Sequence, residues 1–407
     1  MTDTIQLCER TKCTGCGACA AKCPHGAITM QEDDEGFPMP VIVRGTCRSC
    51  RLCLEACPVL NEQRLNPTPD HVYAAWSKDY GIRTHASSGG LYLTFAKWII
   101  DRGGCVNGVA FDDEFNLQHQ IGTNLADCRT FCGSKYVQAS TEGIFSKVKS
   151  ALASGKPVLF VSTPCQVAAL YAYLGGRPVG LYTCDLVCHG VPSPGRFKSF
   201  VKFIAGKLHL GKVNAYCFRN LQGWGLRTIL TTAEGKAVEI PMDGNAYTKP
   251  FTFGLNFRES CYTCRYSRME RIGDVTIGDF WRVGRWSFFG RSKRHGVSYL
   301  SINSDRGREL VRGVRNQLMI VERPLLETRA NGNLHQPMSR PRIRESYYRK
   351  DWSELNPLLQ GAYAEFGRMS LRKRILLPSY IVAREAFRGC LIALTFLRGR
   401  WLREAEI

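Results

Sequence analysis

Two cysteine runs organise this chain: CTGCGACAAKCP at residues 13–24 and CRSCRLCLEACP at residues 47–58. Each run has the spacing C-x2-C-x2-C-x3-C-P, which is typical of bacterial [4Fe–4S] sites. The first three thiolates of such a run bind one cube, and the fourth cysteine, which follows a bend, binds the other cube. Two structural zinc sites are the alternative. Zinc uses paired ligands and leaves the third cysteine and the cysteine before proline without a role.

The crossed pattern divides the eight cysteines into two sets. The cluster-one set is Cys13, Cys16, Cys19 and Cys57. The cluster-two set is Cys47, Cys50, Cys53 and Cys23. The shared spacing predicts two similar halves of one module. We therefore expect residues 1–66 to form an α+β ferredoxin-like module with two [4Fe–4S] clusters. Cys8 lies outside the pattern and is interpreted as a spare thiol.

The charge of the chain restricts its partners. The 407 residues carry a formal charge of +20, from 55 basic and 35 acidic residues. A basic surface suits an acidic one-electron carrier such as a ferredoxin, an anionic substrate or anionic lipid. No nucleic-acid-binding motif is recognisable, so nucleic acid is not an expected partner.

The 19 cysteines indicate a reducing compartment. Thiolates that bind iron must not be oxidised to disulfides, which predicts a cytoplasmic protein. The stretch Met1–Lys12 has no apolar core of the kind that signal peptides contain.

After the linker NPTP at residues 66–69, the pattern changes. Apolar strands, such as residues 157–161, alternate with helical segments, such as residues 164–174. This alternation predicts an α/β domain at residues 67–340 with a mostly parallel or mixed sheet. Residues 341–407 are expected to form a basic helical tail.

Within the tail, Ser379 is a candidate cap for a helix that runs to Trp401. Charged residues interrupt its apolar side, so it is not a transmembrane span. It could lie peripherally on a membrane surface, on a partner protein or on its own domain.

Two further cysteines follow strands of the α/β domain. Cys165 opens the helix after residues 157–161, and Cys188 follows the strand predicted at residues 179–187. Ligands of open α/β sheets collect at the carboxyl ends of strands, so both thiols are expected in one crevice. Cys261 and Cys264 add a C-x2-C pair, which alone is equally compatible with zinc, a redox pair or iron–sulfur. Together the four residues, the third set, are candidate ligands of a third [4Fe–4S] cluster.

These motifs resemble the beta subunits of the coenzyme F420-reducing hydrogenase and dehydrogenase family. The matching pieces occur in the family's order at residues 87–90 (SSGG), 133–136 (GSKY), 163–166 (TPCQ), 188–193 (CHGVPS), 223–224 (GW), 260–264 (SCYTC) and 277–281 (IGDFW). The resemblance implies FAD in the α/β domain beside a cluster, and a deazaflavin or another organic substrate. One departure, Ser162 where the family often has glycine, leaves F420 itself open.

The resemblance also implies roles for single residues. The backbone of a serine- and glycine-rich helix start suits phosphate, so the first group is assigned to FAD. Candidate cofactor-binding residues are Ser87, Ser88, Gly89, Gly90, Ser134, Lys135, Gln138 and Thr163.

His189 is the candidate proton donor or acceptor because histidine titrates near neutral pH. A hydrogen bond to a cluster sulfur is its alternative role. Asp279 is a second candidate catalytic residue that could orient a flavin or a basic side chain. Trp224 and Trp281 are candidates for stacking on a ring.

Four arginines surround the Cys261 pair and could raise a cluster potential, dock an acidic carrier or lie on a solvated face. They are Arg258, Arg265, Arg268 and Arg271.

The sequence therefore predicts an iron–sulfur flavoprotein oxidoreductase. A flavin is suited to this role because it exchanges single electrons with clusters and hydride equivalents with organic molecules. The alternative is a non-catalytic electron-transfer subunit that serves a partner enzyme.

Overall fold

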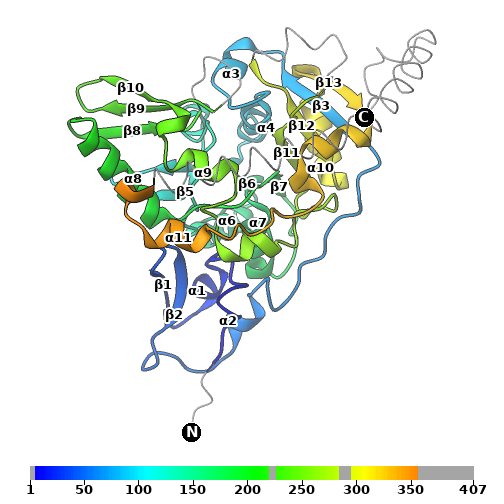
Figure 1. Cartoon of the computed structure of the whole chain (residues 1–407). Helices are drawn as coiled ribbons and strands as arrows, with labels where there is room; N and C mark the ends of the chain where they lie inside the picture. The colour runs from blue at the N-terminus through cyan, green and yellow to red at the C-terminus, as the bar shows by residue number, and fades with distance from the viewer. Residues whose placement is uncertain (1–4, 220–225, 284–294, 356–407) are drawn as a thin grey trace, which may run out of the picture.

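The computed structural model describes residues 5–219, 226–283 and 295–355 (Figure 1). Its N-terminal module consists of α1 (Ala18–Lys22), β1 (Ile28–Glu32), β2 (Pro38–Ile42) and α2 (Leu52–Glu55), with β1 antiparallel to β2. The two cysteine runs share one backbone conformation. Gly15 and Gly17 have φ values of 61° and 72°, and the equivalent Ser49 and Arg51 have 52° and 62°. The predicted similarity of the two halves is therefore seen in the backbone.

The α/β part of the chain is built on one eight-stranded sheet with the order β13-β3-β12-β11-β7-β6-β4-β5. Its strands are β3 (Val72–Ser77), β4 (Cys105–Phe111), β5 (Leu117–Gly122), β6 (Val158–Ser162), β7 (Leu181–Leu186), β11 (Val275–Asp279), β12 (Ser298–Ile302) and β13 (Leu318–Arg323). The central strands β4, β6, β7 and β11 are parallel, and every other neighbouring pair is antiparallel. The sheet is mixed, as one of the two predicted forms.

Helices cover both faces of this sheet. They are α3 (Tyr80–Thr84), α4 (Leu91–Ile100), α5 (Leu125–Thr130), α6 (Ile144–Ala153), α7 (Pro164–Leu174) and α10 (Asp305–Gly313). Side chains alternate across a strand, so Leu159 of β6 packs with α4 and α10, whereas Val158 and Phe160 pack with α6 and α7. Because β6 is covered on both faces, its sequence VLFVS reads as a nearly continuous apolar run.

A second, smaller layer adjoins the main sheet. It contains α8 (Pro194–Lys207), β8 (Val213–Cys217), β9 (Thr228–Thr232), β10 (Ala237–Ile240), α9 (Thr248–Thr252) and α11 (Arg344–Arg349), with its three strands antiparallel. Aromatic rings fill its core, including a pair 5.1 Å apart, Phe197 and Tyr247. Short 3-10 turns occur at Met242–Gly244, Glu259–Thr263, Arg315–Gln317, Leu325–Ala330 and Gly332–Leu334.

The N-terminal module lies at one end of the molecule, beneath α6, α7 and α11 (Figure 1). Of the predicted tail, only residues 341–355 are described, and the helix predicted from Ser379 to Trp401 lies outside the described residues. No helix within the described ranges is long and apolar enough to cross a membrane.

Candidate redox site

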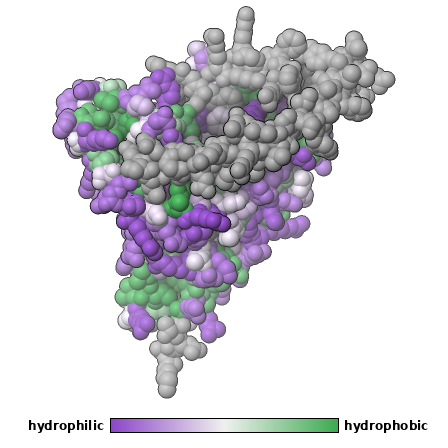
Figure 2. All heavy atoms as spheres, in the orientation of Figure 1, coloured by the Kyte–Doolittle hydropathy of each residue, from purple (hydrophilic) through white to green (hydrophobic). Residues whose placement is uncertain are grey.

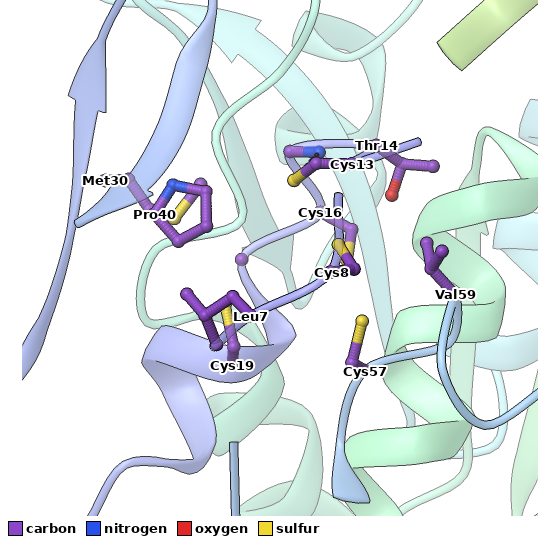
Figure 3. A pocket seen from close by; sticks show the side chains of 12 residues that line it. Leu7, Cys8, Cys13, Thr14, Cys16, Cys19, Met30, Pro40, Cys57 and Val59 are labelled. Carbon is purple, nitrogen blue, oxygen red and sulfur yellow. Dashed lines mark hydrogen bonds between the residues drawn. The ribbon is translucent and has the colours of Figure 1, made fainter. Parts of the chain in front are cut away.

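The cluster-one cysteines lie around one pocket (Figure 3). Cys13, Cys16, Cys19 and Cys57 all line it, so the second run supplies one member, as the crossed pattern predicts. The backbone N–H of Gly15 points at the Cys13 sulfur, 3.4 Å away. Four thiols with N–H···S hydrogen bonding are the donor set that a [4Fe–4S] cube requires.

Cys8 lines the same pocket, which the sequence reasoning missed (Figure 3). Hydrogen bonding to the sulfurs of Cys13 and Cys57 raises the pKa of Cys8. The same contact lowers the pKa of Cys13 to about 6 and that of Cys57 to about 6. Cys8 lies outside the cysteine motif, so only the fold reveals that its sulfur is close to those of Cys13 and Cys57.

The cluster-two cysteines lie at the outer side of the module. Cys53 is buried next to Cys23 and Cys50; burial raises its pKa, and these two neighbours add to the shift. The N–H of Ala27 lies 3.3 Å from the Cys23 sulfur. Cys50 is exposed, in contrast to Cys13, Cys16 and Cys57 of the other set. The two sets therefore differ in their access to solvent.

The third set is assembled from three separate parts of the α/β domain. Cys165 opens α7 after β6, Cys188 follows β7, and Cys261 and Cys264 belong to the turn at Glu259–Thr263 and its end. Burial raises the pKa of Cys188 to about 12, with a further contribution from Cys261 and Cys264. Burial likewise raises the pKa of Cys165, with contributions from Cys188 and Cys264. The four thiols therefore lie in one neighbourhood.

A buried ion pair holds the elements of the third set together. Nη2 of Arg271 lies 2.9 Å from Oδ1 of Asp185, and both side chains are almost fully buried. Oδ2 of Asp185 accepts the backbone N–H of Gly273 at 2.9 Å. Arg271 also donates to the carbonyl oxygens of Leu186 and Tyr266. Asp185 and Arg271 thus fix the Cys188 loop against the Cys261–Cys264 loop.

Three side chains of the α/β part hold four consecutive carbonyl oxygens of the cluster-one loop. Nε of Arg258 donates to the carbonyl oxygen of Cys13 at 2.7 Å, and the hydroxyl of Thr141 donates to the carbonyl oxygen of Cys16 at 2.8 Å. Between them, Nε2 of Gln138 donates to residues 14 and 15 at 3.0 and 3.1 Å. The amide of Gln138 is thus engaged at the module interface, apart from the other proposed FAD residues.

The cluster-one set faces the third set across this interface. Cys16 contributes to the raised pKa of Cys165, whose main cause is burial. Tyr266 lies near both, because burial raises its pKa and Cys165 and Cys16 both add to this shift. Cys16, Cys165 and Cys264 also contact one apolar cluster with Tyr266.

The four arginines near Cys261 divide into two kinds. Arg258 and Arg271 are buried, so neither can dock a carrier from the surface. Arg265 pairs with Glu62 at 2.8 Å, and Arg268 is exposed. Arg258 makes its polar contacts with carbonyl oxygens, Gln138 and the sulfur of Met39. None of the described residues gives it a carboxylate partner.

The predicted FAD loops meet at the start of α4. Ser87 Oγ accepts the N–H of Ser134 at 2.7 Å. Gly89 donates to Ser298 at 2.9 Å, and a Cβ on Gly89 would collide with the carbonyl oxygen of Ala75. This glycine is required for packing on β3. The hydroxyl of Ser88, in contrast, is buried without a hydrogen-bond partner.

Lys135 lies next to this loop, and its side chain is half-buried. Its Nζ donates to the carbonyl oxygens of Phe131, Cys132 and Gly133 at 2.9–3.2 Å. Burial lowers the pKa of Lys135 to about 8. A cation with a reduced pKa here would be stabilised by an anion.

The predicted catalytic residue Asp279 is linked to Ser134 through Arg219 and Tyr136. Burial lowers the pKa of His189, and Asp279 opposes this shift. Asp279 forms a buried ion pair of 2.5 Å with Arg219. Tyr136 hydrogen-bonds with both Ser134 and Arg219, although burial is the main reason that its pKa is raised. His189 and Asp279 are thus brought near the proposed FAD loops.

Of the two predicted stacking residues, the structure describes Trp281 but not Trp224. Arg219 lies 5.8 Å from the ring centre of Trp281. Trp224 lies outside the described residues.

A buried polar network beneath Cys165 was not predicted from the sequence. Oε1 of Gln166 accepts from Ser162 at 2.6 Å and from Thr163 at 3.2 Å, and His119 Nε2 lies 3.1 Å away. The Thr163 hydroxyl also lies 3.4 Å from the Cys165 sulfur, which places Thr163 at the third set. The hydroxyl of Ser162, the residue that departs from the family pattern, therefore has a hydrogen-bond partner within the protein.

No three His, Cys, Asp or Glu side chains in the described ranges converge as ligands of a single ion.

Two stretches of the chain match known protein families. Residues 12–61 match the 4Fe-4S dicluster domain, so the chain begins with an iron–sulfur module joined to an α/β domain. Residues 155–327 match the family described as the C terminus of the coenzyme F420 hydrogenase/dehydrogenase beta subunit. The predicted resemblance to this family is therefore confirmed over residues 155–327.

Individual relatives are distant. A subunit of the F420H2 dehydrogenase of Methanosarcina mazei is 24% identical over 177 residues, which are 40% of this chain and 49% of that protein. An uncharacterized ferredoxin of Methanocaldococcus jannaschii is 35% identical over 52 residues, 13% of this chain and 66% of that protein. The chain thus spans about half of the first relative and just under two thirds of the second.

Among solved structures, a chain of the F420-reducing [NiFe] hydrogenase complex from Methanosarcina barkeri is similar with a TM-score of 0.44 and 17% identity. The match covers 67% of this chain and 91% of that chain.

Proposed function

We propose that the protein is an iron–sulfur flavoprotein oxidoreductase that moves electrons between an acidic one-electron carrier and an organic molecule or deazaflavin. The observation that carries this proposal is the contact between the cluster-one loop and the α/β part, where Arg258, Gln138 and Thr141 hold the loop. A free-standing ferredoxin would not need four of its loop carbonyls held by another domain.

We propose three [4Fe–4S] sites, one for each cysteine set. The cluster-two set includes the exposed Cys50, the cluster-one set lies at the module interface, and the third set belongs to the α/β domain. This order, from the solvent-exposed cysteine through the module interface to the α/β domain, suits an electron relay. Cytoplasmic location follows from the need to keep these thiols reduced.

The residues around α4 fit the FAD assignment. The hydroxyl of Ser88 is buried and unpartnered, and it precedes the N-terminus of a ten-residue helix, whose dipole favours phosphate. Ser87, Gly90, Ser134 and Lys135 are the residues that would complete the cradle, with one half-buried cation. FAD, when bound, supplies the exchange between one-electron and two-electron chemistry.

His189 is the proposed proton-handling residue. Its burial lowers its pKa, so the imidazole is neutral at pH 7 and can accept a proton at one ring nitrogen. Asp279 is engaged with Arg219 and therefore positions that guanidinium, which would stabilise negative charge on a bound ring.

The second candidate function is electron transfer on behalf of a partner enzyme. It is favoured by the relative whose name describes it as part of a dehydrogenase. In that case the chain would hold the clusters and FAD, while the partner would hold the substrate.

Anaerobic purification tests the proposal. Three cubes predict about twelve irons per chain, and FAD should be released on denaturation. Cys165→Ala should remove about four irons, whereas Cys184→Ala, which truncates a buried thiol of β7, should keep all of them. Equal iron contents in the two variants would contradict the third site.

The two candidate functions differ in what reduces the purified chain. We expect reduced F420 or NADPH to bleach the flavin if the chain holds its own substrate site. Bleaching by a reduced one-electron carrier alone would favour the electron-transfer role. Iron without flavin would contradict the FAD assignment.

A further inference from the structure

We propose that the exposed face around the cluster-two set is the docking surface for an acidic one-electron carrier protein. We call this surface the cluster-two face and define it as residues 41–51. The inference rests on the proposed electron-transfer function and adds to it the place where the carrier binds.

The first observation is the orientation of the module. The cluster-one loop is turned inward, with its carbonyl oxygens bonded to Arg258, Gln138 and Thr141. The cluster-two loop is turned outward, and Cys50 is exposed. Since an electron enters most readily where its acceptor is close to the surface, the outward set is the first acceptor.

The second observation is the charge of this loop. Residues 43–54 contain three arginines and no aspartate or glutamate. Arg44, Arg48 and Arg51 are exposed, and none is ion-paired within the part of the chain that the structure describes. Other basic residues of or near the module are engaged: Arg10 with Asp33, and Arg344 with Glu35.

The third observation is the apolar surface beside the arginines. Val41 and Val43 are 39% and 44% exposed, among few large apolar side chains left exposed in the described residues. They are two positions apart along an extended segment and so face the same side. Figure 2 shows apolar residues gathered over this end of the molecule. Apolar side chains rimmed by positive charge fit a weak, transient interface with an acidic partner.

The short turn at residues 43–47 keeps these groups together. The N–H of Cys47 and that of Thr46 both bond to the carbonyl oxygen of Val43 at 3.1 Å. Arg44 is therefore held next to the first cysteine of the run, and Arg48 follows it directly. The charge that would attract the carrier thus lies beside the proposed electron acceptor.

The test uses the holoprotein and reduced flavodoxin, an acidic one-electron carrier whose absorbance is distinct from that of iron–sulfur clusters. The test variant is the pair Arg44→Glu and Arg48→Glu. Arg51 is left unchanged because its φ is 62° and it precedes α2. The control is the pair Lys212→Glu and Lys236→Glu, exposed residues of the β8–β10 layer that give the same change in net charge.

At low ionic strength we expect the arginine pair to slow electron transfer from flavodoxin at least about tenfold, because steering raises association rates by about 10 to 1,000-fold. The lysine pair should change the rate less than about twofold. Added salt should slow electron transfer from flavodoxin to the parent protein and should reduce the rate difference between the parent and the arginine pair. At high salt, Val43→Ser should still slow the reaction.

Equal losses in the two pairs, or an unchanged rate in the arginine pair, would overturn the docking surface. Reduction by dithionite should be the same in all variants, which shows that the clusters are intact. A parent protein without iron, or one that dithionite does not reduce, would instead contradict the proposed function. Sedimentation is the last check. If the parent protein is a dimer and Val43→Ser dissociates it, the cluster-two face binds a second copy of the chain, and the proposed docking of a carrier is overturned.

Discussion

Nε of Arg258 donates a 2.7 Å hydrogen bond to the carbonyl oxygen of Cys13, a residue 245 positions earlier in the chain. The same guanidinium contacts Gln138 and Pro38, so one side chain joins the α/β part to the cluster-one loop. Its charge also acts on Cys261 of the third set, where it opposes the burial that raises the pKa of that thiol to about 12. Arg258 therefore lies between two proposed cluster sites.

Removing this charge should lower the reduction potential of the adjacent clusters. At an effective dielectric of about 20 and a separation of about 8 Å, a unit charge contributes about 2 kcal/mol, or about 90 mV. We expect Arg258→Gln to shift the potential down by about 50–100 mV, measured by redox titration with electron paramagnetic resonance. Arg268→Gln, which removes an exposed charge nearby, should shift it far less. Equal shifts would show that Arg258 has no special position.

Breaking the Asp185–Arg271 pair should destabilise the fold and the third site together. Asp185→Asn leaves a buried guanidinium without its counter-charge, which typically costs about 3–5 kcal/mol. We expect that loss in the free energy of unfolding, together with loss of about four irons. Glu62→Gln is the matched control, because the Glu62 side chain is exposed and loss of its pair with Arg265 should cost less than about 1 kcal/mol. A stable Asp185→Asn protein with full iron would refute this role.

Ser88→Ala should weaken FAD binding without weakening the fold. The Ser88 hydroxyl has no hydrogen-bond partner in the protein, so its removal should leave the flavin-free stability unchanged. A lost hydrogen bond to charged phosphate costs about 1.5–3 kcal/mol, or at least about tenfold in the dissociation constant. The change in the dissociation constant is measured by equilibrium binding of FAD to the flavin-free chain.

The comparison for Ser88 is Ser298→Ala. That change removes the acceptor of the Gly89 N–H and should lower flavin-free stability by about 1–3 kcal/mol. Unchanged FAD affinity in Ser88→Ala would remove Ser88 from the cofactor site.

His119 should make the protein sensitive to acid. Burial lowers its pKa from 6.5 to about 4 in the folded state. The unfolded state therefore binds more protons between these values, and stability is lost as the pH falls from about 6.5 to about 4, by about 3 kcal/mol. Unfolding measured at several pH values should show this loss in the parent and a smaller one in His119→Gln. The same pH slope in both proteins would exclude His119 as the cause.

Local sequence determined the elements that depend on neighbouring residues. The run at residues 164–174 begins with proline and is followed by Gly175, and α7 has the predicted bounds. The cysteine spacing likewise specified the module, because a fixed number of residues between thiolates sets which corners of a cube they can reach. In contrast, β5, β8 and α10 were not predicted, since their polar or interrupted patterns become strands and helices only through packing. The strand β13 was not predicted either, although it begins with four apolar residues.

The tertiary structure decided which residues share a site. The sequence brought Cys165, Cys188 and the Cys261 pair together through a general rule about strand ends, but it gave no sign of the contacts that Arg258, Thr141 and Cys8 make. It also gave no sign that the amide of Gln138, a candidate FAD residue, donates to the cluster-one loop. Contacts between residues more than a hundred positions apart depend on how two modules dock. Spacing along the chain carries no information on that docking, and only the folded arrangement of the modules determined it.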